Sequence, residues 1–448
     1  MPEPAGETCL AFLPRIVMSS SDTFDNCRMK GLTITTLGCN LAYSFRVSPI
    51  FQAQFLAGPV VAPKENEPVM QESPDMAVDT DSHAEPRFTL KEILRQPLLW
   101  AITRDRVRLA SERLGLQAKL RNAHVLLTGA GTSAYAASAI ASARPRSIAV
   151  PTTDLLLDLD RYLPDIDVVI SLARSGDSPE SAAVVERVRA LRPKIEQFAI
   201  VCNEDGALSR SKVDGLITLD PRTNDHSLVM TSAFSNLALA GLVLARPDAV
   251  ADTVNAFSAR ATKLLPDIDE ACQRAAARVR DRIVILSSSP LHGWAQEAGL
   301  KMLEMTAGRF PVITETYLGL RHGPMSFVKP DSFVLCLRSN DHVRRLYETD
   351  LIEELRAKGI GHLAGIADPQ EGEGLFDEVI PAVSLHTDDA LRTPYEIMGP
   401  QLLGYHLSLR CGLNPDNPSP DGIINRVVQG VRIHPTGRNG VHHRDQVS

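Results

Sequence analysis

Three side chains in one stretch of the sequence are suited to moving a proton. Glu297, Lys301 and Glu304 stand at positions i, i+4 and i+7, so they share one face of the helix that the apolar spacing predicts there. Further along, His322 stands in the run Arg-His-Gly-Pro, where a Gly-Pro turn bends the backbone sharply. Two carboxylates, an amine and an imidazole are sufficient for general acid–base catalysis. A Glu-Lys-Glu face is more often a solvated helix surface with ion pairs, and that alternative stays open here.

Two polar loops carry residues suited to binding a phosphate. One spans residues 129–133 (Gly-Ala-Gly-Thr-Ser) and the other spans residues 173–178 (Ala-Arg-Ser-Gly-Asp-Ser). Each follows a predicted strand and precedes a predicted helix, so glycines, hydroxyls and helix N–H groups all favour an anion there. The loop residues expected to line this phosphate site are Gly131, Thr132, Ser133, Ser175, Gly176 and Ser178.

Two other interpretations of these loops are open. Serine and threonine at such positions often only cap the following helix. A dinucleotide site is less favoured, because Gly129 and Gly131 supply Gly-x-Gly but Ala134 stands at the third glycine position. Two such loops after successive strands favour a phosphate, because open α/β sheets bind ligands at the carboxyl ends of their strands.

The elements that position these residues alternate between strand and helix. Strands are predicted over residues 124–127, 167–172 and 198–202, and, after the same plan returns at Arg282, over residues 332–338 and 363–368. This alternation predicts an α/β fold in two copies, each a parallel sheet covered by helices. The two polar loops are expected only in the first copy, and the Glu-Lys-Glu helix with His322 only in the second.

Helices are also predicted before and between the two copies. Thr89 is expected to cap a short helix, and Pro97 to open a longer one. The side chains of that longer helix expected to face a core are Leu98, Ile102, Val107, Leu109 and Leu114. Residues 230–244 and 252–280 are predicted to be helical connectors.

Composition narrows the class of protein. The formal net charge of -7 argues against nucleic acid as the main partner, and no apolar run approaches the roughly 20 residues that span a bilayer. The seven cysteines are scattered without a Cys-x-x-Cys pair, which indicates a reducing, cytoplasmic compartment. No ligand set for a metal or an organic cofactor is recognisable, and we expect neither.

The first 85 residues differ from the rest. They lack helical or strand periodicity and end in an acidic, proline-bearing run over residues 64–86. We expect this segment to be disordered or to be a mis-called extension, with Met70 or Met76 as alternative starts to Met1.

The order of the motifs resembles that of a known family. Gly-x-Gly-Thr-Ser, Ser-Gly-x-Ser, Glu-x-x-x-Lys-x-x-Glu and Arg-His-Gly-Pro resemble the double sugar isomerase (SIS) domain, as in the isomerase half of glucosamine-6-phosphate synthase. The chain is more similar still to the tagatose-6-phosphate ketose/aldose isomerase family, also described as galactosamine-6-phosphate deaminase/isomerases. Further runs at residues 171–181, 391–398, 401–405 and 425–431 carry that resemblance.

The resemblance implies a domain plan. Two tandem SIS domains of flavodoxin-like, three-layer αβα type are expected over residues 88–265, with the N-terminal helices, and over residues 266–412. A C-terminal tail, residues 413–448, is expected to close the site and to be disordered after about residue 436.

The resemblance also implies a role for each site residue. Glu304 matches the carboxylate that moves a proton between C1 and C2, with Lys301 and Glu297 as its polar companions. His322 matches the imidazole credited with sugar ring opening, which the neighbouring subunit of a homodimer supplies. The matches to phosphate contacts are Thr132, Ser133, Ser175 and Ser178.

Two departures from the synthase pattern stand out. The synthase loop Ser-Gln-Ser-Gly-Glu-Thr is replaced by residues 173–178, which lose one hydroxyl, so Arg174 becomes a candidate bidentate phosphate ligand. Near the C-terminus, Gln429 stands where the synthase carries an active-site lysine.

The reaction implied is the deaminating isomerisation of an amino sugar phosphate, similar to galactosamine 6-phosphate, to a ketose 6-phosphate and ammonia. Glu304 would take the C2 proton of the open-chain sugar and return it at C1, and water would hydrolyse the resulting ketimine. Two alternatives are aldose/ketose isomerisation without loss of ammonia and a sugar-phosphate-binding regulator without catalysis. The sequence leaves the sugar stereoisomer open.

Overall fold

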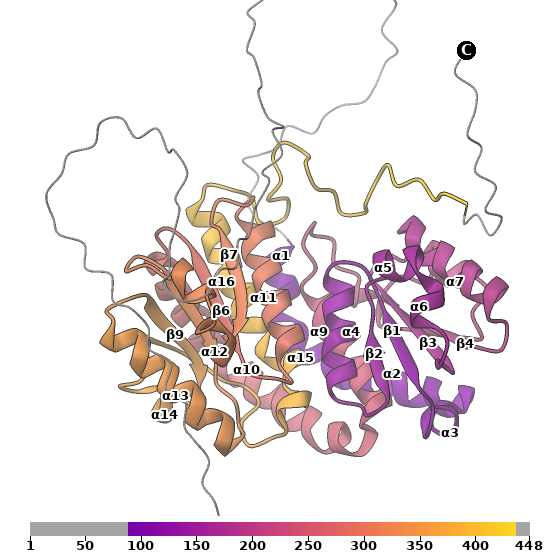
Figure 1. The fold of residues 1–448 in the computed structure, drawn as a ribbon, viewed down its shortest axis with the longest axis horizontal. Coiled ribbons are helices and arrows are strands. Elements are labelled where there is room, and N and C mark those ends of the chain that lie inside the picture. The colour runs from indigo at the N-terminus through magenta and orange to yellow at the C-terminus, as the bar shows by residue number, and fades with distance from the viewer. Residues whose placement is uncertain (1–87, 436–448) are drawn as a thin grey trace, which may run out of the picture. The chain divides into compact units, whose positions relative to one another are not determined.

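Two five-stranded parallel sheets form the framework of the computed structural model, which describes residues 88–435 (Figure 1). The first sheet has the strand order β2-β1-β3-β4-β5 and the second β10-β9-β8-β6-β7. Numbered within each sheet, both orders read second, first, third, fourth, fifth, which is the flavodoxin-like order. The predicted duplicated α/β fold is therefore confirmed.

The strands of the first sheet are β1 (Val125–Thr128), β2 (Ser147–Ala149), β3 (Val168–Ala173), β4 (Glu196–Val201) and β5 (Gly215–Thr218). Those of the second sheet are β6 (Ile283–Ser287), β7 (Val312–Thr316), β8 (Phe333–Leu337), β9 (His362–Ala367) and β10 (Glu378–Pro381).

The helices up to the middle of the chain are α1 (Thr89–Leu94), α2 (Gln96–Leu114), α3 (Leu116–Leu120), α4 (Thr132–Ser142), α5 (Thr152–Leu157), α6 (Leu159–Tyr162), α7 (Pro179–Leu191), α8 (Ala207–Arg210), α9 (Ser232–Ala245) and α10 (Pro247–Arg278). Those that follow are α11 (His292–Met305), α12 (Tyr317–Leu320), α13 (His342–Ala357), α14 (Pro369–Gly372), α15 (Thr393–Glu396) and α16 (Met398–Arg410). Short 3-10 helices are η1 (Pro221–Thr223), η2 (Pro324–Phe327) and η3 (Asp389–Leu391).

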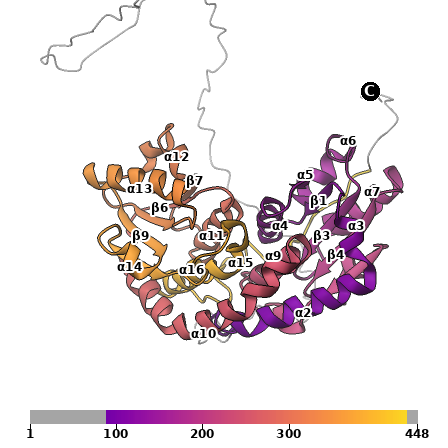
Figure 2. The same cartoon turned by 90° about the horizontal axis from the view of Figure 1, so that it is seen from below.

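Alternating strand side chains separate the cores on the two faces of each sheet. In β1, Leu127 faces a large central core and Leu126 faces a smaller core under α5, α6 and α7. In β6, Ile285 faces the same central core and Val284 faces an outer core that includes α13. The central core thus receives one face of both sheets, and α4, α9, α10, α11 and α16 pack within it (Figure 2).

The strands that the sequence did not predict are the four edge strands, β2, β5, β7 and β10. Their side chains are partly exposed, so they lack the continuous apolar runs that mark the buried inner strands. The inner strands were all predicted to within two residues.

The buried face of α2 differs from the predicted one. Val107 is buried as expected, but Leu98 and Leu109 are 67% and 57% exposed, so their assignment to the core is wrong. The buried face includes Thr103, whose hydroxyl donates to Asn236 Oδ1 at 2.6 Å. Because Thr103 on the buried face is polar, the apolar pattern of the sequence did not mark this face of α2.

Two predicted boundaries also changed. Thr89 is the first residue of α1 rather than its N-cap, and its hydroxyl donates to the carbonyl of Pro415 at 2.9 Å. The predicted domain boundary at residues 265 and 266 lies inside α10, which continues through Pro266. The predictions for residues 1–85 and for those after 435 fall outside the described residues. No helix of residues 88–435 is long and apolar enough to cross a membrane.

The contact between α4 and α11 depends on Gly293. A Cβ at this position would lie 2.7 Å from both Ala139 N and Tyr135 O, which are backbone atoms of α4. We expect Gly293→Ala to push the two helices apart and to lower the free energy of unfolding by about 1 to 3 kcal/mol, measured by urea denaturation.

Gly399→Ala in α16 is the matched control, because its Cβ would meet only side-chain atoms, the nearest at 3.2 Å. Equal losses in the two variants would contradict close α4 to α11 packing as the cause.

Candidate active site

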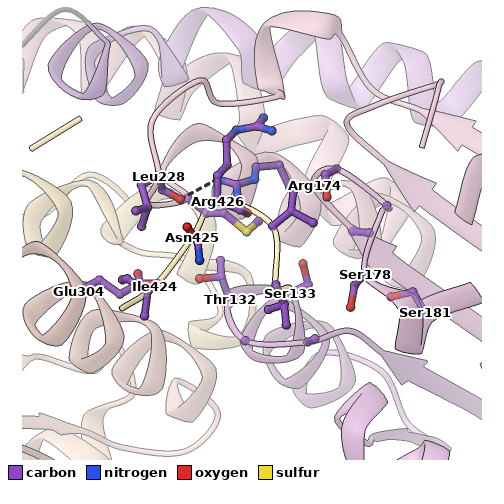
Figure 3. Close-up of a pocket in the computed structure, with 18 of the residues that line it drawn as sticks. Thr132, Ser133, Arg174, Ser178, Ser181, Leu228, Glu304, Ile424, Asn425 and Arg426 are labelled. Atoms are coloured by element: carbon purple, nitrogen blue, oxygen red, sulfur yellow. Dashed lines mark hydrogen bonds between the residues drawn. The ribbon is translucent and has the colours of Figure 1, made fainter. Parts of the chain in front are cut away.

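A cavity of about 410 Å³ lies at the carboxyl ends of β1 and β3, where the order of the first sheet reverses. The loops after β1 and β3 form one side, and α11 from the second half of the chain brings Glu304 to it (Figure 3). Residues 423–429, here called the closing segment, also line it. The predicted phosphate-site residues are all among its lining: Gly131, Thr132, Ser133, Arg174, Ser175, Gly176 and Ser178.

The hydroxyls of these two loops do not cap the helices that follow them. Thr132 begins α4 after Gly131, whose φ of 54° lies in the left-handed region that favours glycine, and no side chain caps this helix. Ser178 occupies the N-cap position of α7, yet its Oγ donates to Glu180 Oε2 at 2.5 Å. The interpretation as ordinary capping is therefore wrong, and both helix N-termini face the cavity uncapped by side chains.

Arg174 is buried, and both of its terminal nitrogens are already bonded. Nη1 donates to the carbonyls of Ser227 and Leu228, at 3.2 and 3.0 Å, and Nη2 donates to the carbonyl of Arg426. The Nε atom is buried without a hydrogen-bond partner in the described part of the chain. Three of the five guanidinium N–H groups thus bind backbone carbonyls, one of them in the closing segment, and the bidentate phosphate contact of Arg174 stays a prediction.

Arg426 fixes the closing segment through both its side chain and its backbone carbonyl. The guanidinium of this residue donates to Asn224 Oδ1 at 2.7 Å and to the carbonyl of Asp225 at 2.6 Å. Its own carbonyl accepts from Arg174, as described above. These bonds determine where the preceding residues lie, and Figure 3 shows Ile424 and Asn425 beside the cavity near Glu304.

Lys301 lies behind the cavity wall, where three acceptors surround its ammonium group. Nζ lies 2.6 Å from Glu304 Oε2, 3.2 Å from Glu297 Oε1 and 3.3 Å from Thr132 Oγ1. The ammonium donates hydrogen bonds to Glu304 and Thr132 and forms an ion pair with Glu297, so its three close neighbours are all protein groups. Lys301 and Glu297 are 0% exposed, whereas Glu304 is 23% exposed and lines the cavity. The interpretation as a solvated helix face is therefore wrong.

Burial and the neighbouring charges shift pKa values in this cluster. Burial raises the pKa of Glu297 to about 8, against the opposing effect of Lys301. Burial lowers the pKa of Lys301, but Glu297 and Glu304 outweigh it, so this pKa lies above its ordinary value. Glu297 is therefore largely protonated near neutral pH, and the shortest bond from the ammonium goes to Glu304.

His322 lies outside this cavity. It follows α12 in an exposed turn, and neither it nor its neighbours in that turn line the cavity. The preceding Arg321 instead pairs with Glu354, with Nε 2.7 Å from Oε2. A single chain thus brings together the two carboxylates and the amine but not the imidazole, whose place in a partner's site stays a proposal.

Some lining residues were not predicted as part of the site. Leu228 and Met230 precede α9, Leu300 lies on α11, and Asn425 and Arg426 belong to the closing segment. The run at residues 425–431 had entered only as a sign of family resemblance. The bonds from Arg174 and Arg426 that bring distant segments to the cavity leave no spacing signal in the sequence.

Known proteins provide a comparison for this geometry. No family model matches the chain. The D-galactosamine-6-phosphate deaminase AgaS of Shewanella sp. (strain ANA-3) is 34% identical over 368 residues, which cover 78% of this chain and 92% of that protein.

Solved structures are similar as well. The tagatose-6-phosphate ketose/aldose isomerase from Escherichia coli superposes with a TM-score of 0.71 at 30% identity, covering 80% of this chain and 99% of that one. The C-terminal domain of glucosamine-fructose-6-phosphate aminotransferase from Francisella tularensis, at 19% identity and a TM-score of 0.60, covers 74% of this chain and 98% of that one and shares the fold.

The raised pKa of Glu297 predicts a pH-dependent stability difference. Because the folded pKa of about 8 exceeds the ordinary 4.5, folding takes up a proton between these values, and the parent's free energy of unfolding falls as pH rises through this window. Gln cannot titrate, so Glu297→Gln should gain roughly 2 to 4 kcal/mol relative to the parent between about pH 5 and pH 8.5.

Urea denaturation at several pH values across this range measures the difference. Glu353→Gln, which replaces an exposed carboxylate of α13, is the control and should show no such trend. A pH-independent difference between Glu297→Gln and the parent would contradict the protonated state of Glu297.

Proposed function

We propose that this chain, which belongs to the family of AgaS-type D-galactosamine-6-phosphate deaminases and tagatose-6-phosphate ketose/aldose isomerases, catalyses the deaminating isomerisation of an amino sugar phosphate. It is an enzyme of the sugar-phosphate deaminase/isomerase type. The observation that carries the proposed reaction is Glu304 beside a buried ammonium, lining the same cavity as two uncapped helix N-termini.

The phosphate group would bind at the ends of β1 and β3. Hydroxyls from Thr132, Ser133, Ser175 and Ser178 line this part of the cavity, and the N-termini of α4 and α7 add partial positive charge. Ser178 would turn its hydroxyl from Glu180 to the phosphate, while Thr132 keeps its contact with Lys301. Anchoring one end of the open-chain sugar places its C1 and C2 toward α11.

Glu304 would then move the proton. Its carboxylate takes the C2 hydrogen of the open-chain amino sugar, leaving an enolamine across C1 and C2, and returns that proton to C1. The product is a ketimine at C2. Water adds to the ketimine carbon and ammonia leaves, so the balanced reaction is amino sugar phosphate plus water to ketose phosphate plus ammonia.

Lys301 and Glu297 support this step without contacting the sugar. The ammonium of Lys301 is surrounded by Glu304, Thr132 and Glu297, and neither Lys301 nor Glu297 lines the cavity. The ammonium holds the Glu304 carboxylate at 2.6 Å, and a largely protonated Glu297 leaves the ammonium for that contact. Both are positioning residues in this proposal.

Aldose/ketose isomerisation is the second candidate, because the similar E. coli structure is that of a tagatose-6-phosphate ketose/aldose isomerase. The proton transfer is the same, and the group on C2 decides the outcome: an amine leads to ammonia and a hydroxyl leads directly to the ketose. A regulator without catalysis is less favoured, because binding a phosphate does not require a carboxylate paired with a buried ammonium.

Glu304→Gln tests the proton transfer. The change keeps the shape and removes the basicity, so turnover of galactosamine 6-phosphate, followed by ammonia release, should fall at least ~10²-fold. Exchange of the C2 hydrogen with deuterated solvent should stop to the same extent.

Binding of the sugar phosphate and the melting temperature serve as controls and should change little. If exchange and ammonia release both continue near the parent rate, Glu304 is not the base. Glucosamine 6-phosphate and tagatose 6-phosphate, assayed in parallel with the parent, separate deamination from plain isomerisation.

The exposed position of His322 supports a homodimer with shared sites. We expect Glu304→Gln and His322→Ala chains to be inactive alone and to regain activity when mixed and reassembled, because one hybrid site in each mixed dimer is complete. Light scattering measures whether the mixed chains assemble into dimers. A mixed dimer that assembles and stays inactive would contradict the shared site, whereas a fully active His322→Ala chain would remove His322 from the reaction.

A further inference from the structure

The strand order of the second sheet reverses between β6 and β8, as that of the first sheet reverses between β1 and β3, and we call each of these places a switch point. At the second switch point, side chains of the protein fill the space beyond the strand ends. In the first sheet the loops after β1 and β3 border an open cavity. In the second, the loop at residues 288–291 and the loop at residues 338–341 converge on the carboxylates of Glu348 and Asp389, which are 0% and 2% exposed.

The loop after β8 is of the same type as the loop after β3. Arg-Ser-Asn-Asp at residues 338–341 follows β8 directly, as Arg-Ser-Gly-Asp at residues 174–177 follows β3. The second copy therefore has a loop related to the one predicted only in the first copy. Its motif differs because Asn340 replaces the glycine and the second serine is absent.

Glu348 accepts bonds from both loops. Ser288 Oγ donates to Oε1 at 2.7 Å, and the backbone N–H of Ser339 donates to Oε2 at 3.0 Å. Arg338 adds charge, with Nη1 3.7 Å from Oε2. A hydroxyl, an N–H group and a guanidinium thus surround one buried carboxylate.

Asp389 completes the arrangement. Its Oδ1 accepts from the backbone N–H of Asn340 at 2.8 Å and from Arg392 Nη1 at 2.9 Å. Its Oδ2 accepts from Ser339 Oγ and from Arg344 Nη1, the latter at 3.3 Å. The four donors come from four residues on three segments, which is the way a protein surrounds a bound oxyanion.

We propose that the second switch point is an anion-binding site whose ligand is built into the chain, with Asp389 and Glu348 in the place of a bound anion. The serine hydroxyls, backbone N–H groups and arginines that would bind a small oxyanion are present but already occupied. A chain with two switch points therefore binds one phosphate group, and removal of the Asp389 carboxylate leaves a site for a small carboxylate such as formate.

Asp389→Ala tests the proposal by chemical rescue. The variant keeps all four donors and should melt roughly 5 to 15 °C below the parent in sodium chloride, because breaking a buried charge network is costly. Sodium formate at the same ionic strength should raise this melting temperature by several degrees, because formate binds the folded variant.

Asp377→Ala is the matched control. Asp377 accepts from the backbone N–H of Leu363 at 2.8 Å and from Arg356 at 3.2 Å, but it lies at the opposite end of β9 and is 40% exposed. Its variant should show no formate-specific gain. Equal responses of the two variants to formate would overturn the proposal.

Two measurements cover other outcomes. If Asp389→Ala does not fold in chloride, circular dichroism after refolding in formate replaces the melting curve. Recovery of the folded signal supports the proposal, and failure to recover it overturns the proposal.

In the parent, calorimetric titration with inorganic phosphate should give at most one phosphate per chain, and two per chain would overturn the proposal.

Discussion

The site depends on one buried ammonium group. Lys301 is fully buried, and a lysine there is tolerated only because Glu304 and Thr132 accept hydrogen bonds from it and Glu297 forms an ion pair with it. Thr132 belongs to α4 of the first half of the chain, and the other residues belong to α11 of the second. The requirement to pair this charge therefore determines where the last turn of α11 lies relative to the first turn of α4.

The same helix links the two switch points. α11 begins just after the loop that Ser288 attaches to Glu348, and its last turn carries Glu304 beside the cavity of the first sheet. Its 14 residues span about 21 Å, and Gly293 lets its first turn approach the backbone of α4. The filled second switch point thus positions the start of the helix whose other end carries the proposed base, which gives the two copies different tasks.

Sequence reasoning predicted the parts of this protein that have a regular pattern. The inner strands are continuous apolar runs, and Glu297, Lys301 and Glu304 follow helical spacing, so both could be found in one dimension. The edge strands have no such run, and their side chains are only partly buried. The bond from Arg174 to the carbonyl of Arg426 in the closing segment joins residues 252 positions apart, and no periodicity encodes such a pair.

Charge balance explains why Arg174 belongs in a loop where the synthase pattern has a glutamine. Glu180 accepts from Ser178 beside the proposed phosphate site, and Glu304 lines the same cavity, so a bound sugar phosphate dianion would have two carboxylates around it. Arg174 stays charged although its burial and the nearby Arg426 lower its pKa, because a guanidinium does not deprotonate in proteins. Its hydrogen bonds are used on backbone carbonyls, which are neutral, so its charge is not cancelled by a carboxylate of its own. Arg174 therefore contributes twice: its donors position the closing segment, and its uncompensated charge offsets the two carboxylates at the place where a phosphate would bind.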